Sequence, residues 1–199
     1  MLHIFIGSPA EESRPGSVGR PVPGYEAAVV DEAMHPVAPG EVGRLAVRGP
    51  TGCRYLDDER QSVYVVEGWN LTGDAFRVDE DGYFWFAARN DDLIVSAGYN
   101  ISPLEVEGAL LQHDAVAECA VVASPDEQRG HVVKAFVVVA DGVGAGDELA
   151  AALQQHVKER IAPYKYPRRI EFVDALPRTL TGKVQRAVLR KREHDAAPV

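Results

Sequence analysis

The residue with the clearest chemical potential is a lysine near the end of the chain, in the stretch Leu176–Arg186 (LPRTLTGKVQR). Lys183 directly follows Thr-Gly. Both residue types favour turns, and glycine lets the backbone come close to a ligand. On such a mobile turn, a lysine offers a compact ammonium group to a phosphate or a carboxylate. A solvated charge in a polar turn is the simpler alternative.

Residues that could form a site together with Lys183 lie in several polar or glycine-containing stretches. The chain has no recognisable serine–histidine–aspartate arrangement and no glycine-rich phosphate loop, and its six histidines are scattered. The candidate stretches are Thr72–Asp74 (TGD), Arg89–Asp92 (RNDD), Gly98–Asn100 (GYN) and Pro103–Glu107 (PLEVE). None of them identifies a chemistry alone, so their placement on structural elements matters.

Length and composition permit one large or two small domains with a real core, because 46% of the 199 residues are hydrophobic. The formal net charge is −9, from 30 acidic and 21 basic residues. This acidic balance argues against bulk binding of nucleic acid or of acidic membranes. The late part of the chain is nevertheless basic, as a local anion site requires: Lys165, Arg168, Arg169, Arg178, Lys183, Arg186, Arg190, Lys191 and Arg192.

The two cysteines, Cys53 and Cys119, have neither metal-ligand spacing nor the pattern of a disulfide framework. We therefore expect reduced thiols in a cytoplasmic protein. No run of residues is long and apolar enough to span a membrane. The first residues, 1–7, lack the positive region of a signal peptide and resemble a strand that begins in mid-structure, which favours a fragment or a late start.

Residues 1–90 are predicted to be mostly β. A short helix is expected within 55–67, and 69–74 should form a compact turn that closes on a carboxylate. The four polar residues 89–92 interrupt the apolar pattern and mark a domain boundary. The predicted strands lie at about 25–31, 44–48, 75–78 and 83–87.

Residues 91–199 are predicted to form a small α+β domain in the order β-α-β-β-α-β-α, with helices packed on a short sheet. Ser102 as N-cap, a proline at the first helical position and Glu105 completing a capping box predict the first helix. Asp147 can cap the second helix, and a third, basic helix is expected at 184–191. The apolar residues of the second helix recur every four positions, at Leu149, Leu153, Val157 and Ile161.

Together these motifs resemble the AMP-forming acyl- and aryl-CoA ligases of the adenylate-forming superfamily. The motifs occur in the family's order and cover nearly the whole chain. The resemblance implies an α+β chain in which residues 1–90 are the end of the large N-terminal domain, a β-barrel-like subdomain, and 91–199 are the mobile C-terminal AMP-binding-enzyme domain. Stretches that resemble benzoate- and 2-aminobenzoate-CoA ligases in particular are 1–6, 19–25, 52–56, 68–74, 126–130, 133–136 and 162–168.

The resemblance implies a reaction in two halves. An aromatic carboxylate and ATP give an acyl-adenylate and pyrophosphate, and the thiolate of CoA then displaces AMP. The phosphate loop and the Mg²⁺ would belong to the part of the large domain that this chain lacks, so no metal ligand is assigned within it and the isolated fragment is expected not to turn over. The resemblance is compatible with a homodimer of the full-length enzyme.

By resemblance, Lys183 is the adenylation lysine, which bridges the substrate carboxylate and the α-phosphate as negative charge develops. Asp74 corresponds to the carboxylate that accepts hydrogen bonds from both ribose hydroxyls, since its four lone-pair sites suit a vicinal diol. Arg89 corresponds to an arginine on the ribose or phosphate, although Ala88 replaces the usual glycine before it. Asp91 corresponds to the hinge of the small domain, or is simply a β-turn aspartate.

The resemblance also implies a coenzyme A site. After domain rotation, the stretch 96–99 would line the tunnel for the pantetheine arm, with Ala97, Gly98 and Tyr99 close to it. Arg129 and the stretch 164–168 would hold the nucleotide of CoA. Arginine and tyrosine can stack on adenine, while Lys165 and Arg168 can meet the 3′-phosphate. For each of them, a solvated basic loop is the alternative.

His3 and Ile4 resemble positions that line the aryl pocket, where a flat ring needs apolar walls. Two other functions stay open. The same motifs serve enzymes that load an acyl group onto a phosphopantetheinyl carrier protein, although the basic loop at 165–168 favours free CoA. A non-catalytic fragment that binds a partner or a nucleotide is the other alternative. The motifs do not identify the acid.

Overall fold

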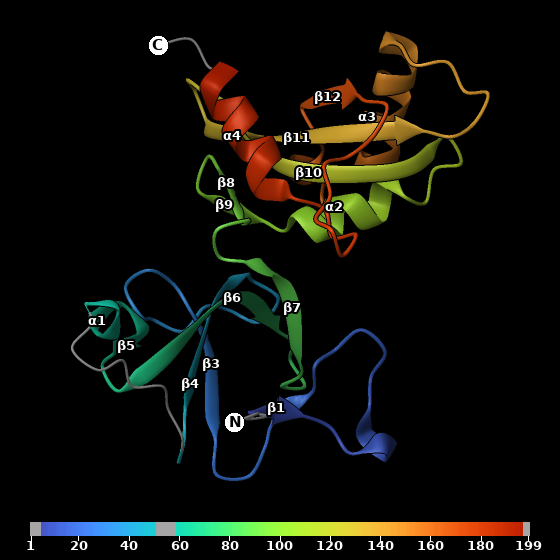
Figure 1. Cartoon of the computed structure of the whole chain (residues 1–199). Helices are drawn as coiled ribbons and strands as arrows, with labels where there is room; N and C mark the ends of the chain where they lie inside the picture. Colours follow the sequence, from blue (N-terminus) through green and yellow to red (C-terminus); the bar gives the residue numbers. More distant parts are fainter. Residues whose placement is uncertain (1–4, 51–58, 197–199) are drawn as a thin grey trace. The chain divides into compact units, whose positions relative to one another are not determined.

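The computed structural model describes residues 5–50 and 59–196, and the chain folds as two compact units, Met1–Asp91 and Asp92–Val199 (Figure 1). The boundary predicted from the sequence lies one residue earlier, between 90 and 91. The predictions made for His3, Ile4 and Cys53 lie outside the described residues.

The N-terminal unit is mostly β in its described part, as the sequence indicates. One short helix, α1 (Arg60–Tyr64), falls inside the stretch where a helix is predicted, and a 3₁₀ turn spans Ala10–Glu12. The strands are β1 (Ile6–Gly7), β2 (Arg20–Pro21), β3 (Glu26–Val30), β4 (Gly43–Arg48), β5 (Val65–Val66), β6 (Trp69–Val78) and β7 (Phe84–Arg89).

Strand β6 is the centre of this unit. It pairs with β4 along one edge and with β5 and β7 along the other, while β3 continues the sheet beyond β4. The compact turn predicted at 69–74 is wrong, because these residues form the first half of β6. Pairing with the neighbouring strands overrides the local turn preference of Thr-Gly-Asp. Gly73 still adopts a left-handed φ of 79°, which makes the strand irregular beside Asp74.

The C-terminal unit contains a three-stranded sheet and a separate hairpin, β8–β9. Strands β10 and β11 are antiparallel, whereas β11 and β12 are parallel and are connected through α3. The elements are β8 (Ile94–Ser96), β9 (Tyr99–Ile101), α2 (Pro103–Leu110), β10 (Val116–Asp126), β11 (Gly130–Val139), α3 (Asp147–Arg160), a 3₁₀ turn (Pro163–Lys165), β12 (Arg169–Phe172) and α4 (Arg186–Ala196).

The two faces of this sheet are covered by different helices, because successive side chains of a strand point to opposite faces. Ala135 and Val137 of β11 pack in a core with α2 and α3, to which Leu153 contributes. Phe136 points to the other face, where it packs with Leu189 of α4. Figure 1 shows α4 crossing the β10–β11 pair. The sheet therefore lies between α2 and α3 on one side and α4 on the other.

The helix signals in the sequence are mostly confirmed. Ser102 Oγ accepts a hydrogen bond from the Glu105 backbone N–H at 3.4 Å, as an N-cap does. The second helix is capped differently from the prediction, since Gly146 is its N-cap and Asp147 is its first helical residue. An acidic first residue still complements the helix dipole. The α+β class predicted from the sequence is confirmed.

Candidate functional site

Lys183 lies on a closed hairpin. Arg178 and Val184 form a β-bridge at its base, and the Thr179 backbone N–H donates to the Lys183 carbonyl at 2.8 Å. Thr179 Oγ1 accepts from the Lys183 N–H at 3.1 Å, and Gly182 has a left-handed φ of 83° that suits glycine. The backbone of this turn, which the sequence predicts to be mobile, is thus closed by hydrogen bonds.

The hairpin is braced from one side by an arginine. Arg178 donates to the Gly182 carbonyl at 2.6 Å and to Glu118 Oε2 of β10 at 2.6 Å. The tip residue Leu180 is fully exposed, and Lys183 is exposed as well. Within the described part of the chain, no carboxylate forms an ion pair with the Lys183 ammonium. This cation is therefore held in place through its backbone while its charge is available to an external anion.

Asp74 and Arg89, the predicted nucleotide-binding residues, face each other in the N-terminal unit. Their Cα atoms are register partners across β6 and β7, and Arg89 Nε lies 3.3 Å from Asp74 Oδ1. Burial raises the pKa of the Asp74 carboxyl, Arg89 lowers it, and Asp91 raises it again. A carboxylate and a guanidinium held side by side can accept from a diol and donate to a phosphate.

A cavity of about 420 Å³ in the N-terminal unit is lined by chain neighbours of these two residues. Its lining includes Thr72, Gly73 and Asn90, which flank Asp74 and Arg89 along the chain. Asn90 Oδ1 is buried without a hydrogen-bond partner among the described residues. The N-terminal unit therefore offers a concave surface beside the predicted ribose contact.

Asp91, the predicted hinge, is the last residue of the N-terminal unit and is exposed. The next residue, Asp92, belongs to the C-terminal unit and forms an ion pair with Arg190 of α4. The backbone N–H of the preceding Asn90 donates to the Gly73 carbonyl at 3.0 Å. The chain is thus attached to a different unit on each side of Asp91, as a hinge position requires, although hinge motion itself stays a prediction.

The β8–β9 hairpin brings several of the predicted CoA-binding residues together. Its two-residue turn, Ala97-Gly98, has φ values of 48° and 83°, the pattern of a type I′ turn. The Ala97 N–H donates to the Arg129 carbonyl at 3.0 Å, and Arg129 Nε donates to Ser96 Oγ at 3.3 Å. Arg129 therefore braces the turn, in addition to any contact it makes with a ligand.

Tyr99 follows this turn and contacts the basic loop. Its ring lies 4.7 Å from that of Tyr164, and both are exposed. Lys165 Nζ lies 5.7 Å from the Tyr164 ring and binds both oxygens of Glu105 at 2.7 Å. Arg168 instead lies over the ring of Tyr166, 4.9 Å away. The structure thus joins Tyr99, Tyr164 and Lys165 in one cluster, and no described contact links Arg168 to it.

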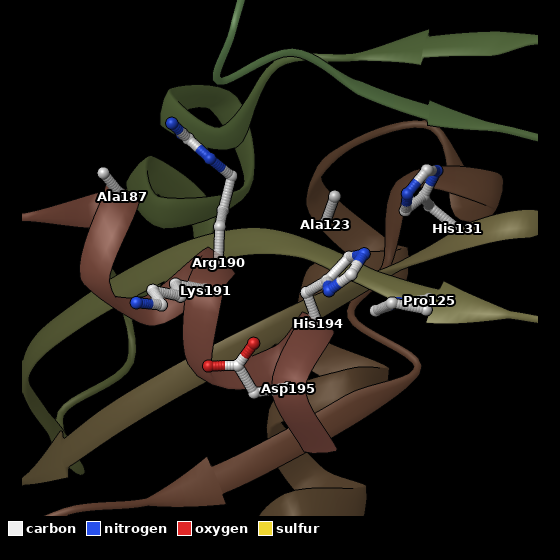
Figure 2. A pocket seen from close by; sticks show the side chains of 8 residues that line it. All are labelled: Ala123, Pro125, His131, Ala187, Arg190, Lys191, His194 and Asp195. Carbon is white, nitrogen blue, oxygen red and sulfur yellow. The ribbon is translucent and has the colours of Figure 1, made fainter. Parts of the chain in front are cut away.

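Another cavity, of about 370 Å³, lies in the C-terminal unit between α4 and the β10–β11 hairpin (Figure 2). His131, Lys191 and His194 are among the residues that line it. Arg190 also lines it, but its side chain extends away from His194 and Asp195 in Figure 2, and it pairs with Asp92. None of the catalytic, nucleotide-binding, CoA-binding or acid-binding residues predicted from the sequence lies in this cavity, although Arg190 and Lys191 belong to the basic late part of the chain.

Among the described residues, no group of three or more histidine, cysteine, aspartate or glutamate side chains is arranged to hold a metal ion. No helix in the described ranges is long and apolar enough to cross a membrane.

Sequence reasoning missed the partners that hold the predicted site in place. The sequence assigns Glu105 only a helix-capping role and gives Glu107 no role. Glu105 binds Lys165, and Glu107 binds Arg186. The available signal was the i,i+2 pair of glutamates on a helix together with arginine three residues after Lys183. Nothing local in the sequence says which cation meets which carboxylate.

Comparison with known families finds two matches along the chain. Residues 105–183 match the AMP-binding enzyme C-terminal domain, and residues 1–55 match the AMP-binding enzyme family. The uncharacterized acyl–CoA ligase YtcI of Bacillus subtilis (strain 168) is 51% identical over 92% of this chain and 35% of its own length. Human acyl-coenzyme A synthetase ACSM4, mitochondrial, is 46% identical over 96% of this chain and 34% of its own length.

Two of the solved structures that resemble this chain are CoA ligases as well. The anthranilate CoA ligase AuaEII in complex with anthranoyl-AMP superposes with a TM-score of 0.78 and 42% identity, over 96% of this chain and 37% of that one. A benzoate CoA ligase from Burkholderia xenovorans LB400 gives a TM-score of 0.74 and 43% identity, over 94% and 38% of the two chains. The chain thus spans about a third of the length of the proteins it matches.

Proposed function

We propose that this chain, which belongs to the adenylate-forming CoA ligases, supplies the lysine, the ribose contact and the CoA-facing hairpin of an ATP-dependent ligase. In the first half-reaction, a carboxylate oxygen attacks the α-phosphorus of ATP and pyrophosphate leaves. In the second, the CoA thiolate attacks the acyl carbon and the bond to AMP breaks.

The observation that carries this proposal is the state of Lys183. Its backbone is held by the hairpin, and in the described chain its ammonium has no carboxylate partner. Other cations nearby are neutralised: Arg178 by Glu118 and Arg186 by Glu107. A lysine whose backbone is held, and whose ammonium has no carboxylate partner among the described residues, is suited to stabilise the charge that grows at the α-phosphate during adenylation.

Asp74 and Arg89 would hold the nucleotide. Burial raises the pKa of Asp74, and Arg89 opposes this effect, so that the carboxylate stays available as an acceptor for the ribose hydroxyls. Arg89 is 61% exposed in its side chain and can turn toward a phosphate. No described residue is assigned to Mg²⁺.

CoA would bind at the cluster of Tyr99, Tyr164 and Lys165. Ala97, Gly98 and Arg129 would contribute to the same site. The two exposed tyrosine rings provide a surface for adenine, and Lys165 provides a charge for the 3′-phosphate. Glu105 holds Lys165 in the absence of ligand. Arg168 lies on the same loop and would contribute from its edge.

For the acid, we infer an aromatic carboxylate of the benzoate or 2-aminobenzoate type. The likeness to anthranilate and benzoate CoA ligases, at 42% and 43% identity, favours it. The likeness to acyl-coenzyme A synthetases, at 46% identity, makes straight-chain acids the competing class. His3 and Ile4, proposed for the acid pocket, lie outside the described residues.

A chimera tests the function. This chain replaces the aligned segment of the Bacillus subtilis relative, and ATP–pyrophosphate exchange is measured with benzoate, 2-aminobenzoate, butyrate and octanoate. We expect exchange and CoA-dependent AMP release. Free CoA is compared with a holo-carrier protein as acceptor. Exchange that Lys183→Ala leaves unchanged would contradict the role of the lysine. Because the rest of the acid pocket comes from the Bacillus subtilis protein, the acid preference is compared with that of the unmodified relative, and a shift toward the straight-chain acids would contradict the aromatic assignment.

A further inference from the structure

Helix α4, which begins three residues after Lys183, is attached to its unit mainly through charged side chains. Arg192 of this helix pairs with Glu171 of β12. Four further residues face the unit at helical spacing: Arg186, Leu189, Arg190 and Glu193. Among them only Leu189 is a buried apolar residue. The other three form ion pairs with Glu107, Asp92 and Lys134. Charged contacts have preferred directions, which apolar contacts lack. Such a helix is therefore fixed in orientation as well as in place.

The contact at the start of α4 is the most extensive of the three. Glu107 of α2 is 6% exposed. Its Oε1 accepts from Arg186 Nε at 3.2 Å and Nη2 at 2.8 Å, and its Oε2 accepts from Nη2 at 2.6 Å. The same carboxylate accepts from the Val121 backbone N–H of β10 at 2.8 Å. One buried carboxylate thus joins α2, the central sheet and the first turn of α4.

This contact lies at the base of the lysine hairpin. Gln185 donates through its backbone N–H to the Pro177 carbonyl at 2.8 Å, which closes the hairpin directly before Arg186. On the other side, Arg178 joins the hairpin to Glu118. The hairpin therefore has two charged anchors, of which the Glu107–Arg186 pair is the buried one.

We propose that Glu107 and Arg186 are positioning residues for Lys183: the buried pair sets the direction in which the hairpin leaves the domain and therefore where the ammonium stands. This proposal rests on the adenylation role of Lys183. Neither residue touches a reacting atom. A bidentate arginine–carboxylate pair restricts rotation at both partners, which a single-point contact does not.

The other end of α4 provides a matched control. Glu193, 8% exposed, accepts from Lys134 at 2.7 Å and from Ser124 Oγ at 2.8 Å. Like Glu107, it is a buried carboxylate with one cationic and one neutral donor. It lies ten positions after Lys183 in the sequence, at the far end of α4 from the hairpin. Loss of the Glu193 charge should weaken the attachment of α4 to the sheet. It should not change the direction in which the hairpin leaves the domain.

The first experiment uses the 199-residue chain alone and does not depend on activity. Spin labels are placed at the exposed tip, Leu180→Cys, and at an exposed position of α3, Ala151→Cys, with Cys53 replaced by serine. Cys119 is replaced by alanine as well, because it is only partly buried and the Glu107 charge contributes to the raised pKa of its thiol. Pulsed electron paramagnetic resonance then gives the distribution of distances between the two labels. Both labels lie in the C-terminal unit.

We expect a narrow distribution in this background and with Glu193→Gln, and a broader or displaced one with Glu107→Gln and with Arg186→Met. Arg186→Lys, which keeps the charge, should recover part of the narrow distribution. Circular dichroism and thermal unfolding confirm that each variant is folded. Equal broadening in Glu107→Gln and Glu193→Gln, or no broadening in Arg186→Met, would overturn the proposal.

The second experiment measures the two half-reactions in the chimera. Because small misplacement of a catalytic group costs on the order of 10- to 100-fold in rate, adenylation should fall by about that factor in Arg186→Met. Thioester formation from preformed acyl-adenylate should be retained, and Glu193→Gln should retain both. Equal losses in both half-reactions would assign the pair a merely structural role. A parent chimera without adenylation would count against the proposed function, and the distance distributions would then decide the positioning role alone.

Discussion

Arg89 and Asp74 are register partners on β7 and β6, and Arg89 Nε lies 3.3 Å from Asp74 Oδ1. Because the arginine side chain is 61% exposed, this pair adds little to the free energy of folding. Its larger effect is on ionisation. Burial raises the pKa of Asp74, and the arginine lowers it. The pair therefore governs whether the carboxylate is charged when a nucleotide arrives.

Replacing Arg89 with methionine should raise the pKa of Asp74 further, because the opposing positive charge is lost while burial remains. A group whose pKa is higher in the folded than in the unfolded state stabilises at low pH, and this contribution is lost as pH rises through the folded pKa. Arg89→Met should lose this contribution to the free energy of unfolding at a higher pH than the parent chain does. Carboxyl carbon NMR of the chain checks this prediction. Arg77→Met, on the same strand as Asp74, serves as the control.

Lys183→Ala should lower the rate of adenylation in the chimera by roughly 100-fold or more, since it removes a charge aimed at the transition state. Thioester formation from preformed acyl-adenylate should be spared. The thermal midpoint should not change measurably, because the side chain is exposed. Lys191→Ala removes another exposed lysine, from α4, and should leave both half-reactions intact. Equal loss in both half-reactions would contradict the assigned role.

Lys165→Met should abolish the preference for CoA over dephospho-CoA, which lacks the 3′-phosphate. The lysine is held by Glu105 at 2.7 Å, within 5.7 Å of the Tyr164 ring. Glu105→Gln removes the competing carboxylate and should tighten binding of CoA more than of dephospho-CoA. Acceptor KM values in the chimera measure both effects. Lys158→Met, which removes a cation from the Tyr166 ring, is the control; a retained preference in Lys165→Met would exclude the phosphate contact.

The sequence predicts most of the elements that carry the site, because their signals are local. Helix α2 follows from its capping pattern, and α3 from apolar residues at every fourth position. The sequence wrongly predicts a turn at 69–74, because Thr-Gly-Asp is typical of turns. In the structure these residues form part of β6, through pairing with strands that are distant in the sequence. Contacts between residues that are far apart in the sequence are likewise not predicted by local patterns. Glu107 meets Arg186, 79 positions away, only because α2 and α4 pack around the same sheet.

Ala97→Gly should raise the free energy of unfolding of the chain by about 1 kcal/mol, because Ala97 has a left-handed φ of 48° in the β8–β9 turn. Glycine adopts this conformation without the steric cost of a Cβ. Urea unfolding provides the measurement. Ala151→Gly in α3 is the matched control, and there the same change should destabilise by about 1 kcal/mol. Destabilisation at both positions would show that the turn is not strained.

Acid should weaken the contact between α2 and α3 through His156, whose ring lies beside that of His113. The rings of His113 and His156 lie 4.8 Å apart. His156 Nε2 lies 3.0 Å from the Ala109 carbonyl, and His113 Nδ1 accepts from the Ala115 N–H at 3.2 Å. Burial lowers the pKa of His156, the hydrogen bond to the Ala109 carbonyl opposes this effect, and Arg160 and His113 lower the pKa further.

The sign of the effect follows from proton binding. Since the pKa of His156 is lower in the folded chain, the unfolded chain takes up the proton first as pH falls below about 6.5. The free energy of unfolding should therefore decrease between about pH 7 and about pH 5, and level off once the folded chain also binds the proton. His156→Gln, which can still donate to Ala109, should reduce this decrease. Urea unfolding at both pH values tests it, with the exposed His194→Gln as control. An unchanged pH dependence in His156→Gln would place the acid sensitivity elsewhere in the chain.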